Sequence, residues 1–300
     1  MREIGDMVRE FERHPGDPFA LATLVLTEGS SYRRPGARML IAGDGRSVGS
    51  LSGGCLEAEV VEKAREVLST QTPALMAFDT RRRFGCNGSL QILVESVQPG
   101  FLAELAACFH GRRPCLIATG YAGPWGSHLV ASEAGRCDGE LLQRVPPRPQ
   151  LLIIGAGPDS AALRHLAETL GWLVRLIDGD RPLASAYDPW TAAVVKTHNY
   201  GRDFAALRAL LPLGLPYVGL LGPRARREQL LGDLLDTGLA HGDNFFAPAG
   251  LDLGGESPEA IALAIIAEIQ AVFAGGSRQF LRDRRAPIHS AREASAAVPS

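Results

Sequence analysis

The sequence is poor in cysteine, in net charge and in long apolar runs. Its five cysteines are an odd number among 300 residues, and none stands in a C-x-x-C pair, which argues against a disulfide framework and a structural zinc site. The formal net charge of −2 provides no overall field for nucleic acid or membranes. No apolar run approaches the roughly 18 residues that span a bilayer, and residues 1–6 carry acids where a signal peptide would be basic and then apolar. We expect a cytoplasmic protein without nucleic-acid or membrane partners.

The hydrophobic content of 46% over 300 residues is enough for about two domains. Residues 145–149 hold three prolines in four positions, which forbid helix and disfavour strand pairing. We therefore predict a linker at 145–149 between a domain over 1–144 and a domain over 150–280. Residues 281–300 have little to bury in a core and are predicted to form a flexible tail.

The first domain is predicted to be α+β. Apolar patterns indicate helices over residues 2–14 and 101–110, and a third helix after residue 55. Several predicted strands between them follow one another too closely for helical crossovers, which favours antiparallel pairing.

The second domain begins with the pattern of a Rossmann-like, doubly wound parallel sheet. The apolar run 151–154 leads directly into Gly155-Ala156-Gly157, a helical pattern ends at Gly171, and a second strand over 173–177 precedes Asp178. Gly155 and Gly157 would let a diphosphate approach the backbone at a helix N-terminus, and Asp178 could accept hydrogen bonds from a ribose diol.

This glycine turn matches G-x-G-x-x-G incompletely. Ser160 replaces the third glycine, and Pro158 and Asp159 stand inside the turn. Proline suits a first helical position, whereas Asp159 would bring negative charge near the phosphates. Nicotinamide binding and a scaffold that holds another ligand, or none, both remain open.

Two further segments follow predicted strands and are expected at the same edge of the sheet. His198 lies in Thr197-His198-Asn199 and is either a functional group or a satisfied loop histidine. Arg224 follows Gly222-Pro223 at a predicted helix start, where it could hold a phosphate or simply be solvated.

Cys55 stands in Ser52-Gly53-Gly54-Cys55-Leu56-Glu57, where a strand-like run gives way to a helical pattern. Free amides and the positive end of the helix dipole favour a thiolate at that point, and thiolates attack electrophiles and bind soft metals. The alternative is a small apolar cysteine that packs under a glycine turn.

Two other segments of the first domain carry candidate ligand groups. The loop over residues 28–38, which ends at Arg38, is rich in glycine, serine and arginine and could cradle an anion. Cys86 lies between glycines in Gly85-Cys86-Asn87-Gly88, and it could converge with Cys55 on one soft ligand or be a small turn residue.

These motifs together resemble the XdhC/CoxI family. The resemblance rests on the segments 29–31, 34–39 and 49–57, followed in the family's order by the segments 155–157, 197–199, 217–222, 250–254 and 257–262. It spans about residues 16 to 275, and the joint occurrence of the motifs is far more specific than any one of them.

The resemblance implies a molybdenum cofactor chaperone. Such proteins bind molybdopterin, work with a cysteine desulfurase while a sulfido ligand is installed, and deliver the cofactor to a xanthine dehydrogenase-type molybdenum hydroxylase. Gly53, Gly54, Cys55 and Glu57 are then implied at the cofactor site, together with Gly155 and Gly157 of the glycine turn. Cys55 and Cys86 become candidate molybdenum contacts, no residue is assigned a catalytic role, and a homodimer is implied.

The chain also differs from the family's pattern. Pro158 and Asp159 stand where a histidine and a small residue are usual, Asn87 replaces a glycine, and residues 81–83 are three arginines in place of an acidic segment. An NAD(P)-dependent oxidoreductase built on the same Rossmann unit remains the alternative, favoured by Asp178 and disfavoured by Asp159 and the missing third glycine.

Overall fold

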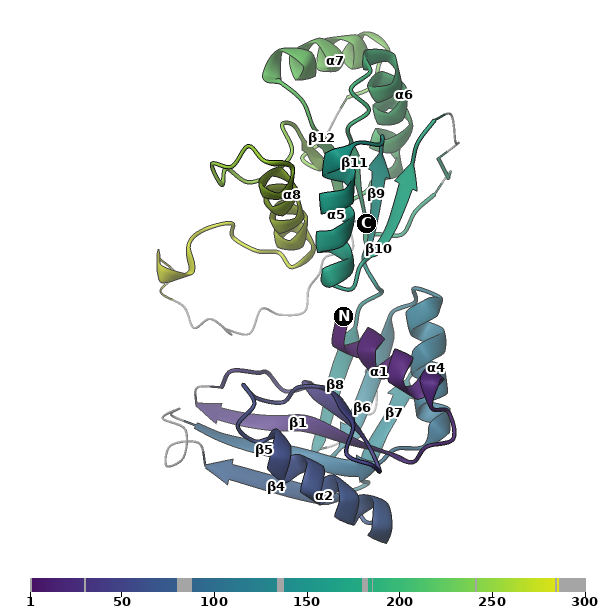
Figure 1. The fold of residues 1–300 in the computed structure, drawn as a ribbon, viewed down its shortest axis with the longest axis vertical. Helices are drawn as coiled ribbons and strands as arrows, with labels where there is room; N and C mark the ends of the chain where they lie inside the picture. Colours follow the sequence, from purple (N-terminus) through teal and green to yellow (C-terminus); the bar gives the residue numbers. More distant parts are fainter. Residues whose placement is uncertain are drawn as a thin grey trace. The chain divides into compact units, whose positions relative to one another are not determined.

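The computed structural model describes residues 2–29, 31–79, 88–133, 138–179, 183–184, 186–240, 242–283 and 285. The chain divides into two compact units, Met1–Pro147 and Arg148–Ser300. The first contains antiparallel sheets and the second a parallel sheet with helices on both faces, which confirms the predicted fold class (Figure 1). Within the described ranges, no helix has the length and apolar character needed to cross a membrane.

The first unit combines a five-stranded antiparallel sheet, in the order β3-β2-β1-β5-β4, with a three-stranded sheet in the order β7-β6-β8. Its elements are α1 (Arg2–Arg13), β1 (Phe19–Gly29), β2 (Arg38–Ala42), β3 (Ser47–Gly49), α2 (Glu57–Thr70), β4 (Ala74–Asp79), β5 (Gly88–Ser96), α4 (Pro99–His110), β6 (Cys115–Gly120), β7 (Gly126–Val130) and β8 (Glu140–Val145).

Both faces of β1 are buried, which explains its nearly continuous apolar sequence. Ala20, Ala22 and Leu24 belong to a core that includes the apolar stripe of α2. Phe19 and Leu21 belong to a second core with side chains from α1, α4 and the three-stranded sheet. The helix α2 thus lies on the five-stranded sheet, which fixes the position of the loop that precedes it.

The second unit has a parallel sheet in the order β10-β9-β11-β12-β13. Its elements are β9 (Gln150–Ile154), α5 (Pro158–Thr169), β10 (Leu173–Ile177), β11 (Thr191–Val195), α6 (Tyr200–Leu210), the 3-10 helix η1 (Leu211–Leu213), β12 (Tyr217–Leu220), α7 (Arg224–Asp236), β13 (Phe245–Phe246), α8 (Pro258–Phe273) and the 3-10 helix η2 (Leu281–Asp283).

Helices cover the two faces of this sheet in pairs. Leu151 and Ile153 pack in one core with α5 and α8, whereas Leu152 and Ile154 pack in another with α6 and α7. The strand order reverses between β9 and β11, the place where such sheets bind ligands. The described residues of the connection from β10 to β11 form no helix, so none of them adds a helix over β10 on the α6 side.

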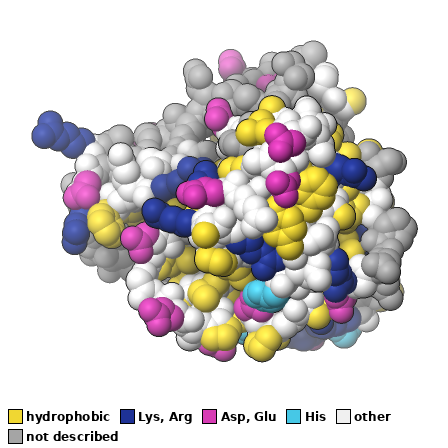
Figure 2. All heavy atoms as spheres, turned by 90° about the horizontal axis from the view of Figure 1, so that it is seen from above, with side chains coloured by type: hydrophobic (Ala, Val, Ile, Leu, Met, Phe, Trp, Pro, Cys, Tyr) yellow, Lys and Arg dark blue, Asp and Glu magenta, His cyan; other side chains and the backbone are white. Residues whose placement is uncertain are grey.

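The face of the molecule that points upward in Figure 1 carries side chains of both charges. Figure 2 shows basic, acidic and apolar side chains interspersed over the described part of this face. This distribution agrees with the near-zero formal net charge of the chain.

Candidate functional site

Residues 50–57, here called the cysteine loop, connect β3 to α2. Leu51 and Leu56 are buried and anchor its two ends in the core under α2. Gly53, Gly54 and Cys55 between them are exposed. The loop therefore exposes its two glycines and its thiol to solvent, while its ends are fixed in the core.

The Glu57 carboxylate holds this loop in shape. Its Oε1 accepts hydrogen bonds from Ser50 Oγ (3.0 Å), the Leu51 amide (3.2 Å) and the Ser52 amide (2.9 Å). Its Oε2 accepts from Ser52 Oγ (2.7 Å) and the Leu56 amide (3.1 Å). Burial alone would raise the pKa of Glu57, but the hydrogen bonds from Ser52, the backbone and Ser50 together lower it to about 2. Glu57 is thus ionised and stabilises the conformation of the loop by accepting these hydrogen bonds.

The exposed apex of the loop offers unpaired donors beside a thiol. Within the described residues the amides of Gly53 and Cys55 have no hydrogen-bond partner, whereas the Gly54 amide donates to Ser52 Oγ at 3.2 Å. Cys55 Sγ lies 3.5 Å from the same hydroxyl. Gly54 has φ 106°, which favours glycine, and open space surrounds Gly53. Two free amides and a thiol at the start of α2 fit an anionic ligand with a soft metal.

Arg38 lies in the interior of the first unit. It is 2% exposed and donates to Gly36 O (3.2 Å), Thr119 Oγ1 (3.3 Å) and Gln143 Oε1. Burial lowers the pKa of its guanidinium to about 10, against the opposing influence of Glu95. Arg38 therefore joins the two sheets of the unit, and this placement favours a structural role over the ligand contact predicted from sequence.

Cys86, the second predicted thiol, lies outside the described residues, as do the three arginines at 81–83. The convergence of Cys86 with Cys55 therefore stays a prediction. Among the described residues, no group of three or more histidine, cysteine or acidic side chains is arranged to hold a metal ion.

The glycine turn of the second unit needs both of its glycines. A Cβ on Gly155, where φ is 107°, would lie 2.7 Å from the Lys196 carbonyl oxygen and from the Thr197 Cα. A Cβ on Gly157 would lie 3.0 Å from Asp159 Oδ1 and 3.1 Å from Lys196 Nζ. The ends of β9 and β11 are therefore in direct contact.

Lys196 is a buried cation that sequence reasoning missed. Its side chain is fully buried, its Nζ lies 2.7 Å from Asp159 Oδ1, and it donates to Ser160 Oγ at 2.8 Å. Ser160 in turn donates to the Gly155 carbonyl at 3.0 Å. The negative charge of Asp159, expected from sequence to oppose phosphates, is thus balanced inside the turn. A lysine that directly ends the apolar run 192–195 is the sequence signal for this role.

A buried acid, Asp203, holds the loop after β11 in place by hydrogen bonds. Asp203 is fully buried, and its Oδ1 accepts from the Thr197 amide (3.0 Å) and hydroxyl (2.5 Å). Its Oδ2 accepts from Arg226 Nη2 at 2.6 Å, which ties this loop to α7. His198 is exposed with φ 56°, and Arg224 is exposed as the first residue of α7. Asp203 and Arg226 hold the loop at the carboxyl edge of the sheet, a role that the sequence patterns did not reveal.

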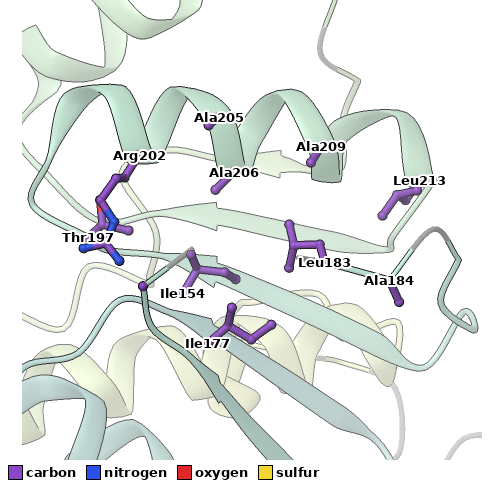
Figure 3. Close-up of a pocket in the computed structure, with 11 residues that line it drawn as sticks. Ile154, Ile177, Leu183, Ala184, Thr197, Arg202, Ala205, Ala206, Ala209 and Leu213 are labelled. Carbon is purple, nitrogen blue, oxygen red and sulfur yellow. The ribbon is translucent and has the colours of Figure 1, made fainter. Parts of the chain in front are cut away.

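A cavity of about 400 Å³ opens beside this edge, between α6 and the ends of β9 and β10 (Figure 3). Asp178 follows the Ile177 wall of the cavity and precedes Gly179, which also lines it. The Asp178 carboxylate is exposed, and its Oδ1 accepts from the Gly179 amide (2.9 Å) and Arg202 Nη2 (3.3 Å). The cavity is lined by Ile154, Ile177, Gly179, Leu183, Ala184, Thr197, Arg202, Ala205, Ala206, Ala209 and Leu213.

Comparison with known proteins places these features in a family. A model of the XdhC Rossmann domain matches residues 151–269, and a model of the XdhC and CoxI family matches residues 13–79. A protein of Bacillus subtilis (strain 168) that is named as a probable xanthine dehydrogenase subunit is 30% identical over 307 aligned residues, which cover 83% of this chain and 91% of that protein. The chain belongs to the XdhC and CoxI family.

Two further relatives of this XdhC and CoxI family member are informative. The molybdenum cofactor insertion chaperone PaoD of Escherichia coli (strain K12) is 27% identical over 278 residues, covering 86% of this chain and 84% of that protein. A crystal structure from Bacillus halodurans, described as a xanthine dehydrogenase, has a TM-score of 0.78 at 24% identity, covering 91% of this chain and 97% of that one. At that identity the likeness supports a shared fold.

Proposed function

We propose that this chain is a molybdenum cofactor-binding chaperone that helps to mature sulfurated molybdopterin and insert it into a xanthine dehydrogenase-type molybdenum hydroxylase. The observation that carries the proposal is the cysteine loop. In it an exposed thiol stands beside two unpaired amides, and the Glu57 carboxylate holds the loop in shape by hydrogen bonds. Membership of the family and the name of the Escherichia coli relative support the same role.

The chemistry of the loop suits the cofactor. Free amides at a helix start bind a phosphate, and a thiolate is a preferred ligand of soft metal centres. We assign the amides of Gly53 and Cys55 to anionic groups of the cofactor and Cys55 Sγ to the molybdenum centre. When bound, the cofactor supplies the metal and the sulfido ligand that the client enzyme needs.

The proposal includes partners and a second thiol. A cysteine desulfurase would supply the sulfur, Cys86 would be the second contact to molybdenum, and the chain would act as a homodimer. These three parts of the proposal, the desulfurase, the Cys86 contact and the homodimer, rest on the resemblance of the sequence to the family.

Cofactor retention tests the proposal. Purified protein is incubated with molybdopterin cofactor, passed through a desalting column, and assayed for molybdenum and for pterin absorbance. Wild type should retain both, and Cys55→Ser should retain at least about tenfold less because the metal loses a thiolate ligand. Cys108→Ser, which changes a partly buried thiol on α4, is the matched control and should behave as wild type. Equal retention by wild type and Cys55→Ser would show that the Cys55 thiol does not hold the cofactor.

An NAD(P)-dependent oxidoreductase is the second candidate, because Asp178 stands where a ribose-binding acid is expected. The Lys196–Asp159 ion pair removes one objection to it, since the charge inside the turn is balanced. This candidate predicts tight NAD(H) binding and turnover by the isolated protein. Tight NAD(H) binding without any retention of pterin would favour it over the chaperone.

A further inference from the structure

Two partly buried thiols of the first unit contact each other outside the cysteine loop. Cys108 belongs to the last turn of α4, and Cys115 is the first residue of β6. A side-chain hydrogen bond joins the two thiols. No C-x-x-C motif marks this pair, because six residues separate the two cysteines in the sequence.

A tight connection brings the end of α4 to the start of β6. The Arg113 amide donates to the Cys108 carbonyl oxygen at 2.9 Å, and Arg112 has φ 48°, a left-handed conformation that reverses the chain after the helix. α4 also packs on the three-stranded sheet through a shared apolar core, against which the Cys115 side chain lies (Figure 1). Both the turn and the core therefore hold the two thiols together.

The protonation of Cys115 fixes the order in which the thiols can react. Burial raises the pKa of the Cys115 thiol to about 11, the Cys108 thiol beside it acts in the same direction, and the Arg38 guanidinium opposes both. Cys115 is therefore protonated at neutral pH. Because the thiolate is the attacking species in thiol–disulfide exchange, Cys108 makes the first attack on an oxidant and Cys115 the second.

We propose that Cys108 and Cys115 form a reversible intramolecular disulfide, with a low-molecular-weight disulfide such as glutathione disulfide as the oxidant. The Cys108 thiolate attacks one sulfur of the oxidant, which forms a mixed disulfide and releases the first glutathione. Cys115 then loses its proton to solvent and attacks the Cys108 sulfur, so that the Cys108–Cys115 bond forms and the second glutathione leaves. The two protein thiols are oxidised, and the oxidant is reduced to two glutathione thiols, which take up the two protons.

The disulfide would fasten the end of α4 to the three-stranded sheet. It closes a ring over residues 108–115, in the sheet whose Thr119 and Gln143 hold Arg38. A covalent ring removes conformations from the unfolded chain, so the oxidised chain should be the more stable form. Cys55 takes no part in this reaction, and the inference is independent of the proposed function.

Peptide mapping of the full chain tests the inference. The reduced protein is incubated with glutathione disulfide at mildly alkaline pH, its remaining thiols are blocked with iodoacetamide, and it is digested with trypsin without reduction. Trypsin cuts between Arg112 and Arg113, so the peptides 84–112 and 113–136 stay joined only where a disulfide links them. Wild type should give the joined peptides, and dithiothreitol should separate them.

Three variants assign the bond to its two sulfurs. The peptide 84–112 also contains Cys86, so Cys86→Ser should keep the joined peptides, whereas Cys108→Ser should lose them. Cys115→Ser should accumulate one glutathione on Cys108, because the second attacking thiol is gone. In wild type, release of the second glutathione should accelerate about tenfold per pH unit between pH 7 and 9, since the thiolate fraction of Cys115 grows in that proportion below its pKa.

Urea unfolding measures the effect of the ring on the fold. Oxidised wild type should have a higher urea midpoint than reduced wild type, whereas the same treatment should leave the midpoint of Cys108→Ser unchanged. No joined peptides in wild type, joined peptides that persist in Cys108→Ser, or an oxidised chain that unfolds at a lower urea concentration than the reduced chain would overturn the inference.

Discussion

Replacing Glu57 by glutamine should loosen the cysteine loop in a pH-dependent way. The carboxylate accepts five hydrogen bonds, three of them from backbone amides. A glutamine keeps one acceptor oxygen, so at least one amide is left unpaired, and the charge that strengthens the remaining bonds is lost. At pH 7 we expect a loss of about 1 to 3 kcal/mol in the free energy of unfolding.

The pH dependence follows from the lowered pKa of Glu57, about 2 against an ordinary 4.5. Between these values the unfolded chain binds more protons at this residue than the folded chain does, so stability rises with pH in this window. The contribution is complete above about pH 4.5 and is lost as the pH falls toward 2. Solvent screening of this partly exposed group limits it to about 1 to 2 kcal/mol.

Urea unfolding of wild type and variant at pH 7, 5, 4 and 3, followed by circular dichroism, measures this difference. The difference in the free energy of unfolding between Glu57→Gln and wild type should become smaller as the pH falls below 4.5. Glu62→Gln on the same helix, which removes an exposed carboxylate paired with Arg65, serves as the control and should change stability little. A gap that is absent at pH 7, or constant down to pH 3, would refute the role given to Glu57.

Two further predictions concern buried charges. Lys196→Met should destabilise the second unit by about 3 kcal/mol, because Asp159 and Ser160 lose their partner. Adding Asp159→Asn should recover part of this loss in stability. Thermal unfolding measures both variants, and no destabilisation by Lys196→Met alone would contradict the ion pair. Burial raises the pKa of Glu95, so the folded chain binds more protons there and its contribution to stability falls as pH rises above the ordinary value near 4.5. Glu95→Gln should flatten that decline in urea unfolding between pH 5 and 8, and an unchanged slope would contradict it.

The parallel sheet could be predicted because its signals are local. The run 151–154 is apolar at every position, since both faces of β9 are covered by helices, and it leads directly into Gly155. The steric need for that glycine comes from Lys196 and Thr197, which follow another strand, β11, yet the glycine is recognisable in the sequence without knowing its neighbours.

The roles of Arg38 and Lys196 in the structure depend on partners that are distant in sequence. Arg38 was predicted to contact an anion, but it is buried and donates hydrogen bonds to Thr119 and Gln143 of the three-stranded sheet. Lys196, which follows β11, pairs with Asp159 in the first turn of α5, a pairing that no local sequence pattern encodes. Glu57 is different, because its donors at Ser50 and Ser52 are near in sequence, and the competing interpretation as a ligand contact came from the family resemblance.

Cofactor retention by wild type and Cys55→Ser, measured as molybdenum and pterin per chain after desalting, tests the central claim most directly. The account predicts that wild type holds metal and pterin together and that the variant, with an unchanged circular dichroism spectrum, holds at least about tenfold less. Wild type that retains neither, or a variant that retains both as well as wild type, would contradict it.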